Sequence, residues 1–243
     1  MNSKSICSTT TAVVIAFIIS CAGTNPPVNI ERSEIKYSKS QTATRLIEGK
    51  KAEYQFWFNN NKWKLVDHEN PLFKVVEAKA KEKNANVYYV LLHNSNEIAA
   101  AIEESRLNSS IENFYKYYSE SIKGGGGDII DKEIRLVNGS DALYIKSSTI
   151  TDSIKYIILN YFLSTESGAI NVIVSTSDNL FAEHESDMLN FLNGLVDPNL
   201  ISQPTKREND IESKLLKLKD LKDKGLITQE DYDKKKNKLL NSY

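Results

Sequence analysis

The sequence predicts an α+β fold, with an antiparallel sheet sandwiched by helices and a small helical hairpin at the C-terminus. Three observations support this prediction. Short runs rich in aromatic and β-branched residues recur between turn signals, as expected of strands. Two segments of the body carry apolar residues at helical spacing. A further helical pattern, interrupted at Gly225, lies near the end of the chain.

The first half of the body is interpreted as three strands and a helix. The runs 54–58 (YQFWF), 73–80 (FKVVEAKA) and 87–92 (VYYVLL) have the composition of strands. The spacing Ser109-x-x-Glu112 then predicts a capping box at the start of a helix that ends at Gly124. The apolar residues along one face of this helix are Ile111, Phe114, Tyr118 and Ile122.

The second half of the body is interpreted as four antiparallel strands and a helix. Residues 129–137 and 142–149 flank Asn138-Gly139, a turn dipeptide typical of β-hairpins. Two more strands, 154–163 and 169–175, complete the run. The final helix has an apolar side that carries Phe181, Met188, Leu192 and Leu195.

The N-terminus has the pattern of a secretory signal. An apolar stretch at residues 12–19 follows Lys4 and a run of Ser and Thr, and it is shorter than the about 20 residues that cross a bilayer. The string at 18–22, Ile-Ile-Ser-Cys-Ala, resembles a bacterial lipobox, although Ile18 stands where leucine is usual. The resemblance implies cleavage before Cys21, a diacylglycerol thioether on its sulfur and an acyl chain such as palmitate on its amino group.

Lipid attachment at Cys21 would place the protein in the cell envelope. Two or three acyl chains anchor a protein durably, because each buried methylene contributes about 0.8 kcal/mol. By analogy with lipoproteins, Ala22 after the cysteine is compatible with an outer membrane facing the periplasm, where the cell has one. The alternative is a plain cleaved signal in which Cys21 happens to lie near the cut.

Composition limits the other possibilities. The second cysteine, Cys7, lies in the segment that would be removed, so we expect no structural disulfide. The hydrophobic core must then stabilise the fold, and 243 residues with 40% apolar content can form one. The formal net charge of −1 gives no basic field for nucleic acid, so we expect no nucleic-acid partner.

The distribution of proline suggests the domain boundaries. We expect a signal peptide at 1–20, a lipidated N-terminus and flexible tether at 21–41, the α+β body at 42–197, a linker at 198–209 and the hairpin at 210–243. A tether of roughly 18 residues would hold the body about 20 to 25 Å from the membrane. Four of the five prolines lie in the tether and the linker, namely Pro26, Pro27, Pro198 and Pro204.

The body resembles the PsbP-like α/β/α fold over about residues 53–195. The resemblance rests on the order of elements, the opening Tyr-x-Phe-x-Phe followed by Trp63, the turn at Asn138-Gly139 and the closing Asp-Met-Leu-Asn-Phe-Leu. Photosystem accessory proteins and many bacterial envelope lipoproteins share that fold. Most members bind or stabilise other proteins and few are enzymes, so the resemblance implies a binding role.

The segment 211–240 resembles the SHOCT motif, a short C-terminal helical hairpin. The resemblance rests on the hallmark stretch 221–232, in which Gly225 allows a left-handed turn and Thr228 caps a second helix with Asp231 three positions later. About 30 residues cannot bury a self-sufficient core. We therefore expect the hairpin to oligomerise or to dock on a protein partner, as the resemblance also implies.

The expected interface is the apolar face of this hairpin. The alternative is a hairpin that folds back on its own body and has no partner role. The residues expected at the interface are Ile211, Leu215, Leu218, Leu221, Leu226, Ile227, Tyr232 and Leu239.

No cofactor, metal ion or catalytic residue is expected. The glycine run 124–127 leads from a helix to a strand and lacks the order of a phosphate-binding loop. The carboxylates Glu103 and Glu104 are interpreted as a common helix-surface pair. His184 lies near Glu185 and Asp187 and could share a metal ion with them, but an acidic surface helix gives the same pattern without one.

The preferred hypothesis is a non-catalytic, membrane-anchored envelope lipoprotein that binds or stabilises protein partners. Its contacts would be membrane lipid through acylated Cys21, and a protein partner or a second copy through the hairpin. The alternative is a lipoprotein that binds a small ligand or a cation in a cleft of the body. An enzyme is a third possibility, since only the lack of a recognisable catalytic constellation argues against it. The tyrosines expected to line that cleft are Tyr88, Tyr89, Tyr144 and Tyr156.

Overall fold

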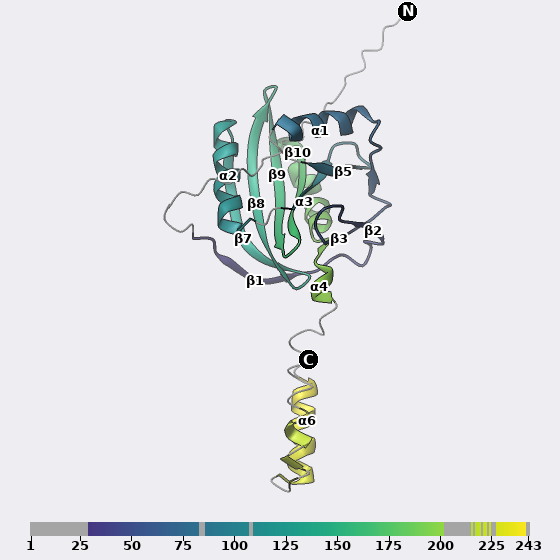
Figure 1. Cartoon of the computed structure of the whole chain (residues 1–243), viewed down its shortest axis with the longest axis vertical. Helices are drawn as coiled ribbons and strands as arrows, with labels where there is room; N and C mark the ends of the chain where they lie inside the picture. Colours follow the sequence, from purple (N-terminus) through teal and green to yellow (C-terminus); the bar gives the residue numbers. More distant parts are fainter. Residues whose placement is uncertain are drawn as a thin grey trace, which may run out of the picture. The chain divides into compact units, whose positions relative to one another are not determined.

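The computed structural model describes residues 29–82, 86–106, 109–201, 215, 217–219, 221–222, 224 and 227–241. The chain divides into two compact units between Asp197 and Pro198. The first unit is the α+β body, and the second contains the C-terminal helices (Figure 1). None of the described helices has both the length and the apolar character that spanning a membrane requires.

The body is built on an eight-stranded sheet with the order β1-β7-β8-β9-β10-β6-β5-β4. Every neighbouring pair is antiparallel except β1 and β7, which are parallel. The strands are β1 (Arg32–Tyr37), β4 (Trp63–Leu65), β5 (Val87–His93), β6 (Ala99–Ser105), β7 (Asp128–Val137), β8 (Ser140–Thr151), β9 (Ile154–Thr165) and β10 (Gly168–Ser177).

Two helices cover one face of this sheet, α1 (Pro71–Glu82) and α2 (Ile111–Gly124). Figure 1 shows α2 running along β7 and β8. Phe114 of α2 stacks on Phe162 of β9 with ring centroids 3.9 Å apart. The helix residues that are buried on this face are Phe73, Val76, Ala80, Phe114, Tyr118 and Ile122.

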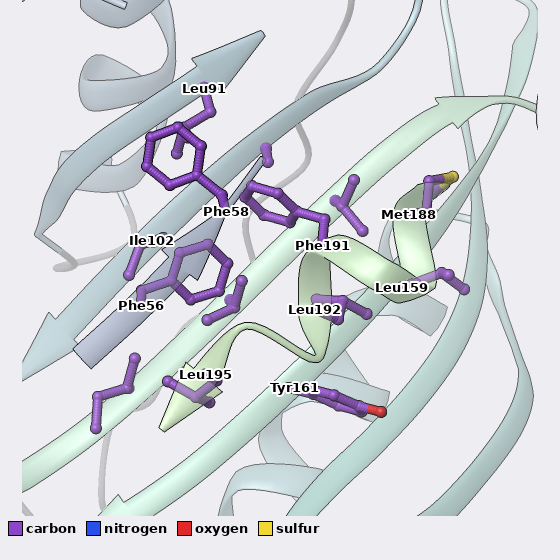
Figure 2. Close-up of a cluster of buried hydrophobic side chains, with 14 of the residues drawn as sticks. Phe56, Phe58, Leu91, Ile102, Leu159, Tyr161, Met188, Phe191, Leu192 and Leu195 are labelled. Atoms are coloured by element: carbon purple, nitrogen blue, oxygen red, sulfur yellow. The ribbon is translucent and has the colours of Figure 1, made fainter. Parts of the chain in front are cut away.

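The other face is covered by α3 (Asp178–Leu192) and by a small second sheet. The small sheet has the order β11-β3-β2, with β2 (Arg45–Glu48), β3 (Gln55–Phe58) and β11 (Leu195–Val196). Figure 2 shows Phe56 and Phe58 of β3 in the same cluster as Phe191 and Leu192 at the end of α3. This cluster therefore joins segments from the beginning and the end of the body's sequence.

The predicted α+β class, with a mostly antiparallel sheet between helices, is confirmed. The helix expected before the strand run is α2, and it ends at Gly124 as predicted. The four strands expected after it are β7 to β10. Asn138 (φ 48°) and Gly139 (φ 93°) form the turn between β7 and β8. Positive φ at both positions is the type I′ geometry that matches strand twist.

The strand predicted at residues 73–80 is wrong, because this segment is helix α1. Asn70 begins the helix: its side-chain oxygen accepts a hydrogen bond from the Leu72 amide at 2.9 Å. Pro71 follows as the first helical residue, where a missing N–H is harmless. Phe73, Val76 and Ala80, three and four positions apart, then face the core. The composition of the run suggested a strand, but its spacing is that of a helix.

Smaller corrections concern where elements begin and end. Ser110 rather than Ser109 caps α2, since its hydroxyl accepts from the Asn113 amide at 3.2 Å. Leu195 belongs to β11 and not to the apolar side of the preceding helix. Strand β1 lies within the segment expected to be a flexible tether, so the sheet starts ten residues earlier than the body was expected to begin.

The linker expected at 198–209 is described only at its start. Residues Pro198–Ile201 form a short helix, α4, and residues 202–209 lie outside the described residues.

We predict that Phe191→Ala lowers the free energy of unfolding by about 3 to 5 kcal/mol. Phe191 is 2% exposed, and its ring lies 4.1 Å from that of Trp63 and 4.8 Å from that of Phe56. Urea denaturation of the chain without its signal segment measures the change. Ile35→Ala is the control, because Ile35 is 63% exposed and its loss should cost less than about 0.5 kcal/mol. Equal losses in the two variants would contradict the packing described.

Candidate functional site

Two buried histidines lie close together where α3 packs beside the turn between β5 and β6. The ring centroids of His93, at the end of β5, and His184, on α3, are 5.8 Å apart. His184 Nε2 lies 2.8 Å from Glu97 Oε2, and His93 Nε2 lies 3.5 Å from Asp187 Oδ2. Lys62 Nζ donates to the other oxygen of Asp187 at 2.5 Å. We call these five residues the histidine cluster.

The hydrogen bonds of His93 define which ring nitrogen carries its proton. The backbone N–H of Ser95 donates to His93 Nδ1 at 3.2 Å, so Nδ1 acts as an acceptor. The proton of the neutral ring is then on Nε2, which faces Asp187. The edge of the Trp63 ring packs against the same imidazole, with centroids 5.1 Å apart. His93 is therefore held as a neutral ring in one orientation.

The surroundings of His93 resist its protonation. Burial lowers the pKa of His93, and the neighbouring His184 and Lys62 lower it further, whereas the carboxylate of Asp187 opposes these effects. The folded protein therefore binds fewer protons at this position than the unfolded chain does in mild acid. The free energy of unfolding must then fall as the pH drops from the unfolded pKa of His93 through its folded pKa.

The histidine cluster can bind a proton, and its contacts connect α3 to β5. Glu185 on α3 pairs with Lys146 at 3.4 Å, while Asp187 pairs with Lys62, so the two carboxylates do not converge with His184. Within the described ranges, no group of three or more His, Cys, Asp or Glu residues is placed to hold a metal ion. The possible metal site at His184, Glu185 and Asp187 is thus not formed.

The paired carboxylates Glu103 and Glu104 lie on strand β6, so the interpretation as a helix-surface pair is wrong. Both are buried, and they face opposite sides of the sheet because they are consecutive. Glu104 Oε2 accepts the amide hydrogens of Lys50 at 2.7 Å and Lys51 at 2.5 Å, and Oε1 accepts from the hydroxyl of Tyr54 at 2.8 Å. Glu104 thus fixes the turn between β2 and β3.

The four tyrosines expected to line a ligand cleft are not brought together. Tyr89 donates its hydroxyl to the Glu48 carbonyl at 2.7 Å. Tyr144 is buried beneath the guanidinium of Arg135, 3.4 Å from its ring centroid, and β9, β10 and β6 separate it from Tyr89. Tyr88 and Tyr156 line neither the cleft of about 480 Å³ beside Tyr115 nor the cleft of about 50 Å³ beside Trp63.

In the second unit, the predicted capping residues are paired as expected. Helix α6 (Gln229–Asn241) starts after Thr228. The Asp231 amide donates to Thr228 Oγ1 at 3.1 Å, and the Thr228 hydroxyl donates to Asp231 Oδ2 at 2.7 Å. The hydroxyl and the backbone N–H of Thr228 both donate to the Asp231 carboxylate, and these two hydrogen bonds lower the pKa of Asp231. Lys222, in the preceding helical segment, places its ammonium 5.2 Å from the centre of the Tyr232 ring, so the two helical segments touch.

The expected interface residues that are described are not buried in this unit. Leu215, Leu218, Ile227 and Tyr232 are half-buried, and Leu221 is 37% exposed. Among the side chains of the second unit whose exposure is described, none is fully buried. The remaining predicted residues, Cys21, Ile211 and Leu226, lie outside the described residues, as does the side chain of Leu239.

Comparison with known proteins supports the assignment of the C-terminal segment. Residues 213–240 match the family model of SHOCT, the Short C-terminal domain. No curated protein sequence matches the chain. The solution structure of cyanobacterial PsbP (CyanoP) from Synechocystis sp. PCC 6803 is similar, with a TM-score of 0.46 and 13% identity over 73% of this chain and 97% of that one. LpqN of Mycobacterium tuberculosis, described as involved in cell envelope biogenesis, has a TM-score of 0.34 and 10% identity over 63% and 82%.

We predict that His93→Gln reduces the loss of stability on acidification. The wild-type protein should lose free energy of unfolding between about pH 7.5 and pH 5.5, because its unfolded state gains a proton at His93 that the folded state resists. Glutamine does not titrate, so the loss should be smaller. Urea denaturation at both pH values measures it. His68→Gln is the matched control, because it replaces an exposed histidine outside the histidine cluster. An equal loss in wild type and His93→Gln would show that His93 does not contribute.

Proposed function

We propose that this chain is a non-catalytic lipoprotein of a bacterial cell envelope, anchored to its membrane through acylated Cys21. In this proposal its C-terminal hairpin docks on a protein partner or on a second copy of the chain. In this arrangement the anchor attaches the α+β body to the membrane, and the hairpin attaches it to the partner.

The observation that carries the proposal is the incomplete burial of the hairpin. Its described apolar residues, Leu215, Leu218, Leu221, Ile227 and Tyr232, are half-buried or exposed. Fully burying a leucine side chain contributes about 1.5 to 3 kcal/mol. A surface that covers this face would therefore stabilise the hairpin substantially, and the match to the SHOCT model over residues 213–240 supports the choice of this segment.

The histidine cluster pairs each imidazole with a carboxylate, and both pairs join elements of the fold. The sequence features at Cys21, an apolar stretch before a cysteine flanked by small residues, support the membrane anchor.

We predict that the hairpin is required for capture of partners from the native envelope. Tagged full-length protein, extracted in mild detergent, should retain protein partners or untagged copies of itself, and a chain that ends at Pro204 should retain neither. Leu218→Glu should weaken retention about tenfold or more, because it places a charge on the apolar face that the partner would cover. Lys217→Glu is the matched control, since Lys217 precedes Leu218 in the sequence and its side chain is exposed.

The same experiment separates the alternatives for the hairpin. Retention by the truncated chain would assign the interaction to the body and contradict the proposal. A hairpin folded on its own body would give no partner with any variant, and Leu218→Glu would then lower the thermal midpoint of the protein without changing what it captures.

We predict that Cys21→Ser moves the protein from the membrane fraction to the soluble fraction. Acyl chains supply the anchor in this proposal, and serine cannot form the thioether. Fractionation of cells that express each form measures the change, and the intact mass of the wild-type protein reports the added lipid. A wild-type mass without lipid, or a membrane-bound Cys21→Ser protein, would contradict anchoring at this cysteine.

A further inference from the structure

A cleft of about 480 Å³ lies where the chain enters the body, between α2 and the first half of β7. Its volume is within the range of about 300 to 1,000 Å³ that is typical of small-ligand sites. The residues that line it are Asn29, Glu31, Tyr115, Lys123, Asp128, Ile129, Ile130, Asp131 and Lys132.

The backbone fixes two sides of this cleft. The amide of Ile134 in β7 donates to the Glu31 carbonyl at 2.8 Å, which holds the entering segment against the sheet. The pairing of β7 with β8 shifts register between Ile129 and Asp131, as in a β-bulge. Ile130 lies at this shift and is 50% exposed. An apolar side chain is therefore presented to solvent beside charged ones.

The charged side chains of the cleft carry both signs. Lys123 and Lys132 are positive, and Glu31, Asp128 and Asp131 are negative. Within the part of the chain that the structure describes, none of the five forms an ion pair. A ligand with one anionic and one cationic group would find partners of both signs here, whereas a purely anionic ligand would face three carboxylates.

The contact between Lys132 and Tyr115 favours one kind of cation. The ammonium of Lys132 donates to the Tyr115 hydroxyl at 3.1 Å and lies 4.4 Å from the centre of its ring. Tyr115 is the one aromatic residue in the lining, so a quaternary ammonium would compete with Lys132 for that ring. A primary ammonium can instead donate hydrogen bonds to the carboxylates.

The position of the cleft relative to Cys21 suggests where such a ligand comes from. Eight residues beyond Cys21 the chain reaches Asn29, which lines the cleft. An extended chain spans at most about 3.6 Å per residue, so Asn29 lies within about 30 Å of an anchored Cys21. Tethering over such a distance gives effective concentrations on the order of millimolar, enough for weak headgroup binding to be populated.

We propose that this cleft binds the headgroup of an ethanolamine phospholipid in the membrane that holds the anchor. Lys123 faces the phosphate, the carboxylates of Glu31 and Asp128 face the ammonium, and Ile130 faces the apolar edge of the lipid layer. The inference rests on the proposed anchoring at Cys21. It adds a second, non-covalent contact that orients the body on the membrane surface.

Hydrogen exchange on chemically anchored protein tests this proposal. In a chain that starts at residue 21, Cys21 is the only cysteine, so it couples selectively to a maleimide phospholipid in vesicles. Peptides that cover 111–134 should exchange about twofold more slowly on vesicles of phosphatidylethanolamine and phosphatidylcholine than on phosphatidylcholine alone, since a site with a dissociation constant near the effective concentration is about half occupied. Equal exchange on both vesicles, or equal slowing on phosphatidylglycerol, would overturn it.

Two variants make the result specific to the cleft. Lys123→Glu should abolish the slowing, whereas Lys155→Glu, an exposed lysine on β9 outside the cleft lining, should retain it. Unchanged thermal midpoints show that both variants fold. Slowing that persists in Lys123→Glu would contradict the proposed site. Because the anchor is attached chemically, failure here leaves acylation in cells untouched, and failure of acylation is detected separately by intact mass.

Discussion

Burial of both faces of the central strands is the constraint on which the rest of the structure depends. Strand β10 is buried along almost its whole length, and β9 beyond its first two residues. A strand that is apolar on both faces needs cover on both sides. Helices α1 and α2 supply it on one face, and α3 with the small sheet supplies it on the other. This double cover brings Phe56, from the start of the body, against Phe191, from its end.

The same burial determines how polar groups are satisfied inside the body. Glu104 accepts amide hydrogens from the turn after β2, and Glu103 accepts from Asn171 at 2.9 Å. From Asn171 the hydrogen bonds continue through Asn160 to the hydroxyl of Tyr118 on α2. A buried carboxylate without partners costs several kcal/mol, so these contacts favour one position of the turn and of α2. Polar interior groups therefore specify the arrangement that apolar burial stabilises.

Arg135 connects the sheet to the segment that leads to the proposed anchor. Its guanidinium lies 3.4 Å from the ring centre of Tyr144 and 4.6 Å from that of Tyr37 on β1, and it pairs with Glu133 at 2.6 Å. These contacts hold β1 on β7, as an edge strand in parallel pairing. The body therefore includes β1, so the tether in our proposal would be shorter than expected and the cleft beside α2 would lie nearer to the proposed anchor.

The sequence by itself determined the elements whose signals are local, because capping, turn and spacing rules act within a few residues. These include α2, the hairpin at Asn138-Gly139, strands β7 to β10 and the Thr228 cap of α6. Local composition misled at 73–80, where helical spacing after Asn70 decided the outcome. Only the tertiary structure revealed β1, whose partner lies about 100 residues away. It also formed the histidine cluster, since His184 and Glu97 are 87 residues apart and meet only because α3 packs on the sheet.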